Sequence, residues 1–235
     1  MTNLLEARGL FAGYGGMDIL RGCTITVAPR EMVVIVGPNG AGKSTAMKAM
    51  FGLVRIREGR VLFDGKDITN AATESLAPCG LAYVPQEQNV FATLTVEENL
   101  DMGAYTRRSG IAEAKTRVFE LLPALKQKRR QAAGELSGGQ RQMVAIGRAL
   151  MMEPKLLMLD EPSAGLSPKV LSEILQAIAT INAAGVAILM VEQNAKAALA
   201  IADRGYVLAG GQNRFEGPGP ELLANREVAA SFLGG

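Results

Sequence analysis

The chain has 235 residues, a length that suits one large α/β domain or two small ones. Lysine and arginine (25) nearly balance aspartate and glutamate (23), which excludes a protein that coats nucleic acid, because such a protein carries a strongly basic field. Hydrophobic residues make up 48% and charged residues 20%, so a sizeable core is available and wholesale disorder is excluded.

Histidine and cysteine content restricts the chemistry further. The sequence contains no histidine, which excludes a histidine base and a histidine metal ligand. Its two cysteines, Cys23 and Cys79, lie outside any C-x-x-C pattern, so we expect two buried thiols rather than a disulfide framework or a zinc cluster. The sequence has neither a basic start followed by a long apolar run nor a stretch near the roughly 18 apolar residues of a membrane span. We therefore expect a cytoplasmic chain that reaches a membrane only through a partner.

The first third of the chain combines weak alternation with one strongly apolar run. The segments Leu4–Arg8, Thr24–Ala28 and Arg60–Phe63 alternate and predict an antiparallel layer. Glu31–Val36 predicts a buried parallel strand, and a helix is predicted from Lys43 to about Phe51.

The middle of the chain carries helix signals. Thr95 and Glu98 fit a capping box that opens a helix. Ile111–Leu122 is an amphipathic segment that Pro123 closes, and Gly138–Met152 predicts a long helix.

The last third alternates strands with helices. The predicted strands are Leu156–Leu159, Val186–Val191, Tyr206–Ala209 and Arg214–Phe215. One predicted helix begins at Ser167-Pro168, and a second one spans Asn194–Ala202. This order indicates an α/β fold with a mostly parallel core sheet. We expect one domain over residues 1–235, with a core of residues 1–87 and 151–235 and a helical subdomain at about 88–150.

One loop fits the phosphate-binding pattern G-x-x-x-x-G-K-[ST]. Glycines let the backbone bend around a phosphate with its N–H groups inward, and the following helix adds its positive N-terminus. Lys43 supplies a charge to the β- and γ-phosphates, and Ser44 supplies a hydroxyl to Mg²⁺. The alternative is an ordinary glycine turn, but the required strand and helix flank this loop. The loop and the residue after it are Gly37, Pro38, Asn39, Gly40, Ala41, Gly42, Lys43, Ser44 and Thr45.

Two acidic residues follow the apolar run at Leu156–Leu159. A strand there delivers Asp160 to the carboxyl edge of the sheet, beside the phosphate loop, where it helps to hold Mg²⁺. Glu161 can polarise the water that attacks the γ-phosphate. The alternatives are a plain strand end and a surface acid; the phosphate loop favours the metal and base roles.

The segment Leu136-Ser137-Gly138-Gly139-Gln140 lies between the phosphate loop and the acidic pair and resembles the signature of ATP-binding-cassette (ABC) ATPases. The resemblance covers the whole chain. It implies a P-loop NTPase cassette with a mostly parallel core sheet, an N-terminal antiparallel layer and a helical subdomain. It also implies a dimer, in which each ATP lies between the phosphate loop of one subunit and the signature of the other. Ser137 can cap the helix that starts at Gly138, whose N–H groups then face the γ-phosphate of the partner's ATP.

Further site residues are implied by the same resemblance. Tyr14 matches the aromatic residue that stacks on adenine, and Gln86 matches the glutamine that links Mg²⁺ and water to the transmembrane partner. Ser163–Leu166 matches the loop that crosses to the other subunit, and Glu161 matches the catalytic base. Gln193 stands where the family usually has a histidine that contacts the γ-phosphate; an amide can donate that hydrogen bond but carries no charge.

Three segments are similar to one ATP-binding subunit of branched-chain amino acid importers: Val191–Asn194, Leu94–Leu100 and the ending Phe232–Gly235. This likeness implies a second ABC subunit, identical or different, transmembrane permease subunits, and indirectly a solute-binding protein. It places the chain on the inner face of the membrane. The alternatives are a related urea or amide importer ATPase, a non-transport cassette such as an iron–sulfur assembly ATPase, and a nucleotide-gated scaffold without hydrolysis.

Overall fold

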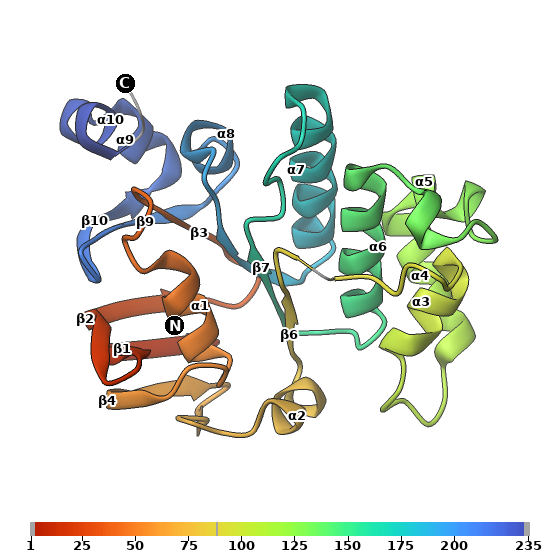
Figure 1. The fold of residues 1–235 in the computed structure, drawn as a ribbon, viewed down its shortest axis with the longest axis horizontal. Coiled ribbons are helices and arrows are strands. Elements are labelled where there is room, and N and C mark those ends of the chain that lie inside the picture. Colours follow the sequence, from red (N-terminus) through yellow and green to blue (C-terminus); the bar gives the residue numbers. More distant parts are fainter. Residues whose placement is uncertain (1–2, 88, 233–235) are drawn as a thin grey trace.

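The computed structural model describes residues 3–87 and 89–232, so most of the ending Phe232–Gly235 lies outside the described residues. A central sheet has the strand order β10-β9-β3-β8-β7-β6 (Figure 1). Its strands are β3 (Met32–Val36), β6 (Leu81–Val84), β7 (Leu156–Asp160), β8 (Ala187–Val191), β9 (Arg204–Ala209) and β10 (Gln212–Pro218). All run parallel except β10, which pairs antiparallel with β9. Every residue of β3, β7 and β8 is buried, as expected for parallel strands covered on both faces.

A second, antiparallel sheet has the order β2-β1-β4-β5. Its strands are β1 (Leu5–Tyr14), β2 (Met17–Val27), β4 (Ile56–Phe63) and β5 (Lys66–Asp67). The predicted antiparallel layer is confirmed, although its strands are longer than the alternation indicated. Helix α1 (Lys43–Met50) contacts strands of both sheets, and its buried face joins one hydrophobic core with them.

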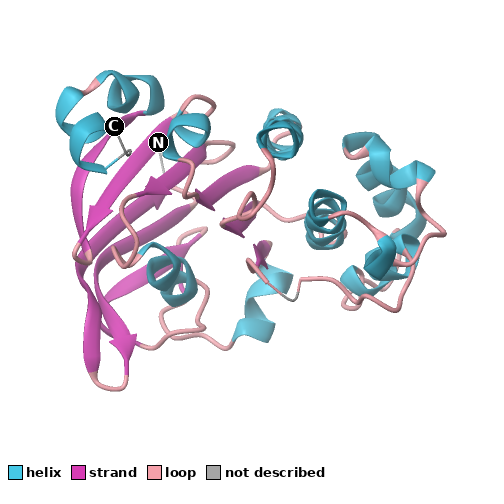
Figure 2. Ribbon diagram, turned by 45° about the horizontal axis from the view of Figure 1, so that its top comes forward, coloured by secondary structure: helices cyan, strands magenta, loops and turns pink. Residues whose placement is uncertain are grey.

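A group of helices lies on the side of the molecule opposite the antiparallel sheet (Figures 1 and 2). It comprises α3 (Val96–Gly103), α4 (Ile111–Leu121), α5 (Pro123–Gln127), the 3-10 turn η2 (Ala133–Glu135) and α6 (Gly138–Leu150). The capping box is confirmed: the Thr95 hydroxyl accepts from the Glu98 N–H (3.2 Å), and the Glu98 carboxylate accepts from the Thr95 N–H (2.8 Å). Pro123 follows the end of α4 as predicted, and it also opens α5, because proline fits the first turn of a helix.

The remaining helices flank the central sheet. They are α2 (Thr73–Leu76), the 3-10 turn η1 (Ala77–Cys79), α7 (Pro168–Ala183), α8 (Ala195–Leu199), α9 (Gly219–Ala224) and α10 (Arg226–Phe232). None of the described helices combines the length and the apolar character that crossing a bilayer requires.

The expectation of two buried thiols is wrong for one cysteine. Cys23 is buried in β2, and this burial raises the pKa of its thiol to about 12. Cys79 is exposed, because it ends η1 in a surface turn, where its thiol donates to the Ser75 carbonyl (3.3 Å).

Candidate active site

The predicted phosphate loop connects β3 to α1, at the carboxyl end of the central sheet. Gly37 has φ 147°, and a Cβ at this position would collide with the carbonyl oxygen of Leu208 on β9. Gly42 caps α1 in the left-handed conformation, with φ 97°. Only glycine meets both demands without strain, so the loop backbone is fixed by its two end glycines.

The Lys43 ammonium lies inside this loop. Its Nζ donates to the carbonyl oxygens of Gly37 (2.9 Å) and Pro38 (3.2 Å), and the residue is only 5% exposed. Burial lowers the pKa of Lys43, and the nearby carboxylates of Glu161 and Asp160 oppose that shift. Two of the three ammonium protons are used by the loop, which leaves one for an anionic ligand.

Asp160 ends β7 with one carboxylate oxygen engaged and the other unpaired. The Tyr83 hydroxyl donates to Asp160 Oδ2 (2.9 Å), while Oδ1 is buried without a hydrogen-bond partner in the described structure. Ser44 and Gln86 line the same hollow as Asp160. A buried, unpaired carboxylate oxygen near a hydroxyl fits Mg²⁺, which takes one or two protein carboxylates together with substrate phosphates. No cluster of three or more aspartate, glutamate, cysteine or histidine residues that could form an all-protein metal cage occurs in the described ranges.

Glu161 adopts a backbone conformation that the sequence did not indicate. Its φ is 47°, in the left-handed region, which costs a non-glycine residue about 1–3 kcal/mol. Its N–H donates to the Val191 carbonyl at the end of β8 (3.0 Å). Gln86 Nε2 donates to Glu161 Oε2 (3.3 Å), so the fold brings together two predicted site residues from separate loops.

Glu192 is a buried acid that sequence reasoning overlooked. Its carboxylate accepts hydrogen bonds from the Ser163 N–H (3.0 Å), the Ser163 hydroxyl (2.8 Å) and the Gln193 N–H (3.1 Å), and it is 2% exposed. Glu192 thereby ties the loop after β7 to the loop after β8. An acid placed directly after the apolar run Val186–Val191 was the available sequence signal.

The pH dependence of stability should reveal the burial of Glu192. Burial raises its pKa above the ordinary 4.5, and hydrogen bonds from Ser163, Asn194 and Gln193 oppose the rise. A raised native pKa gives a stabilising contribution that is fully present below the unfolded pKa and is lost as pH rises through the native pKa. We expect the free energy of unfolding of the wild type, relative to Glu192→Gln, to fall as pH rises from 4.5 to neutrality. Urea unfolding of both proteins measures it, and a constant or rising difference would contradict the assignment.

The signature segment forms the N-terminus of α6. The Ser137 hydroxyl accepts from the Gln140 N–H (3.3 Å) and the Gln140 side chain accepts from the Ser137 N–H (3.1 Å), which confirms the predicted cap. Gly138 is exposed, and a Cβ at buried Gly139 would collide with Val170 on α7. Strands β6 and β7 separate α6 from α1 (Figure 1). Within the described chain, no hydrogen bond joins the signature to the phosphate loop.

Tyr14 and Gln193 are the remaining predicted site residues. Tyr14 ends β1 and is 53% exposed, so its ring is free to receive a ligand. Gln193 is exposed and borders a hollow of about 420 Å³ together with the loop Ser163–Leu166.

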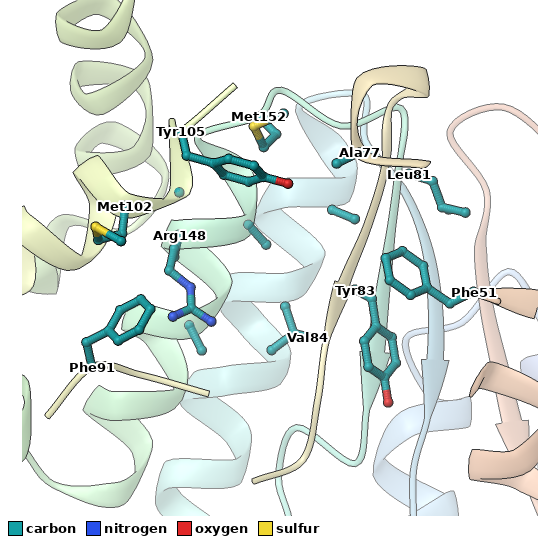
Figure 3. A pocket seen from close by; sticks show the side chains of 14 residues that line it. Phe51, Ala77, Leu81, Tyr83, Val84, Phe91, Met102, Tyr105, Arg148 and Met152 are labelled. Atoms are coloured by element: carbon teal, nitrogen blue, oxygen red, sulfur yellow. The ribbon is translucent and has the colours of Figure 1, made fainter. Parts of the chain in front are cut away.

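A mainly apolar groove of about 470 Å³ is lined by residues of β6 and of helices α3 and α6 (Figure 3). Phe91, Met102 and Tyr105 line it and are 44%, 47% and 68% exposed. The Arg148 guanidinium lies over the Phe91 ring, 5.0 Å from its centroid, and burial lowers the pKa of Arg148. Arg148 forms no ion pair with any acid in the described part of the chain.

Comparison with known proteins defines the class of this chain. The sequence pattern of the ABC transporter family matches residues 20–164. The chain aligns over 100% of its length, and 100% of the other, with the crystal structure of MJ1267, an ATP-binding cassette of an ABC transporter, in its ADP conformation (TM-score 0.89, 31% identity). The chain therefore belongs to the ABC transporter family; it is an ATPase subunit with the P-loop cassette fold predicted from the sequence.

Curated relatives match almost end to end. The chain is 41% identical to the high-affinity branched-chain amino acid transport ATP-binding protein BraG of Pseudomonas aeruginosa, over 94% of this chain and 96% of the relative. It is 40% identical to a probable branched-chain amino acid transport ATP-binding protein, LivF, of Archaeoglobus fulgidus (98% and 99%). The lipopolysaccharide export system ATP-binding protein LptB of Acidithiobacillus ferridurans is 36% identical (100% and 98%).

Proposed function

We propose that this ATPase powers a membrane importer of branched-chain amino acids. The observation that carries the proposal is the 41% and 40% identity to BraG and LivF over nearly the full length of all three chains. The match to LptB favours a second candidate, lipopolysaccharide export, at the lower identity of 36%. The urea or amide importer and the iron–sulfur assembly ATPase stay as further alternatives.

The site geometry supports ATP binding by the phosphate loop, with adenine on Tyr14. Loop N–H groups and the remaining Lys43 proton hold the phosphates. Ser44, Asp160 and Gln86 would hold Mg²⁺, which when bound neutralises charge on the β- and γ-phosphate oxygens. Glu161 accepts the proton of the attacking water, and its contact with Gln86 fixes the carboxylate for that role.

Dimerisation completes the site in this proposal. The exposed N-terminus of α6, capped by Ser137, offers N–H groups that no phosphate loop of its own chain uses. In a dimer these groups face the γ-phosphate on the partner's loop. Each chain then acts as one ATP-binding domain, made of a core at residues 1–87 and 151–235 and a helical subdomain at about 88–150. It contributes the phosphate loop to one ATP site of the dimer and the signature segment to the other.

We place the docking site for the permease subunits in the apolar groove. A docked cytoplasmic segment with apolar side chains would cover Phe91, Met102 and Tyr105. Arg148, half-buried and without an ion-pair partner in the described residues, fits a carboxylate on that segment. The chain is then held at the inner face of the membrane by its partners, and the solute-binding protein acts only through the permease.

The transported solute decides between the alternatives. The chain is purified with the membrane proteins that accompany it, reconstituted in vesicles with its solute-binding protein, and assayed for phosphate release. We expect stimulation by leucine, isoleucine or valine. Stimulation by urea or amides alone would assign the related importer, and stimulation by lipopolysaccharide alone, or the absence of any membrane partner, would contradict amino acid import.

Gln193 gives this site a distinctive pH profile. A histidine at this position titrates near pH 6.5, whereas an amide does not titrate, so we expect no imidazole step in turnover between about pH 6 and 8. Gln193→Ala should slow hydrolysis, because a donor to the γ-phosphate is lost, while nucleotide affinity stays intact. Gln193→His should remain active, and its turnover should show the imidazole protonation step between about pH 6 and 8.

Single-turnover rates across this pH range measure these effects. Gln176→Ala, on the exposed face of α7, is the matched control and should behave as the wild type. If Gln193→Ala hydrolyses ATP as fast as the parent, Gln193 has no role in the chemistry.

A further inference from the structure

Tyr83 lies at the boundary between the apolar groove and the hollow beside the phosphate loop. It is the one described residue that lines both spaces. Its ring stacks on Phe51 in the groove, with centroids 5.1 Å apart and an interplanar angle of 26°. Figure 3 shows the two rings side by side, with the Tyr83 hydroxyl pointing away from Phe51.

At its other end, the Tyr83 side chain fixes Asp160. The hydroxyl donates to Asp160 Oδ2 (2.9 Å), and Asp160 is 3% exposed. With Oδ2 engaged, the buried Oδ1 is the oxygen left without a partner in the described structure and available to a cation. A carboxylate held through one oxygen presents the other in a fixed direction, as outer hydrogen-bond partners do for metal ligands in general.

We propose that Tyr83 is a positioning residue that couples the state of the apolar groove to Mg²⁺ binding by Asp160. The coupling rests on the proposed function, since that assigns Mg²⁺ to Asp160 and a permease segment to the groove. A segment that enters the groove and shifts the Phe51–Tyr83 stack moves the hydroxyl, and the hydroxyl carries the change to the carboxylate. The connection needs one side chain only, because the ring and its hydroxyl form a rigid unit.

The test measures how much Mg²⁺ improves nucleotide affinity. The dissociation constant of a non-hydrolysable ATP analogue is determined by calorimetry in excess Mg²⁺ and again in EDTA. The constant in EDTA divided by the constant in Mg²⁺ is the factor by which the metal improves affinity. Tyr83→Phe keeps the ring and the stack but removes the donor. We expect the ratio to fall about tenfold, with the affinity in EDTA unchanged. A merely structural role would change both affinities together.

A double-mutant cycle tests the connection to the groove. Phe51→Leu disturbs the stack from the groove side and should lower the ratio by about threefold in the wild type, but not in the Tyr83→Phe background. Ile111→Ala, at an exposed apolar position of α4 that lines neither the groove nor the hollow, is the control and should leave the ratio unchanged.

A joint change of both affinities in Tyr83→Phe would overturn the proposal, and so would three further outcomes. If the wild-type ratio is one, Mg²⁺ does not affect nucleotide affinity, and both the Mg²⁺ site and the proposed function are wrong. A normal wild-type ratio that Tyr83→Phe leaves unchanged removes only the role of Tyr83. Equal effects of Phe51→Leu in both backgrounds show that the groove does not act through this hydroxyl.

Discussion

Lys43→Ala should lower ATP affinity by about 10- to 100-fold, the range expected for the loss of a charge-assisted contact to phosphate. Lys43 is buried within the loop, and its ammonium also donates to the carbonyl oxygens of Gly37 and Pro38. The substitution therefore removes a cation and also two hydrogen bonds that hold the loop. Calorimetric titration with nucleotide measures the loss.

Lys155→Ala is the matched control for this variant. Lys155 is exposed and pairs with Asp64 on the surface, so its removal should leave the affinity unchanged. Unchanged affinity in Lys43→Ala would mean that the Gly37–Thr45 loop does not bind phosphate.

Glu161→Gln should bind ATP normally and hydrolyse it about 10²- to 10⁴-fold more slowly, because the base is lost while shape is kept. An amide at this position keeps an oxygen that can accept from Gln86, so the backbone conformation and the neighbouring loop should persist. Phosphate release under saturating ATP measures turnover. Glu173→Gln, on the exposed surface of α7, should retain the parent rate. If Glu161→Gln hydrolyses ATP at the parent rate, Glu161 is not the general base.

The sequence predicts those parts of the site that depend on local structure. The phosphate loop is a continuous pattern between a strand and a helix, and the cap at Ser137 involves a residue three positions away. Even so, β6 was not predicted as a strand, since its four residues, Leu81–Val84, are too few to show a period.

The contacts that join separate loops could not be predicted. Tyr83 and Asp160 are 77 positions apart, and Gln86 and Glu161 are 75 apart. They meet because β6 lies next to β7 in the sheet, and an alternation of strands and helices does not specify that order. The positive φ of Glu161 likewise depends on tertiary context, here its N–H donating to Val191 on the neighbouring strand.

Sedimentation of Glu161→Gln with and without ATP shows whether each ATP is held between the phosphate loop of one subunit and the signature segment of another. Slow hydrolysis preserves the bound ATP, so the protein should sediment as a monomer without nucleotide and as a dimer with ATP and Mg²⁺. Adding Ser137→Arg, which places a bulky side chain on the exposed cap of α6, should abolish the dimer without abolishing ATP binding. A Glu161→Gln protein that is saturated with ATP and still monomeric would contradict an ATP held between two subunits.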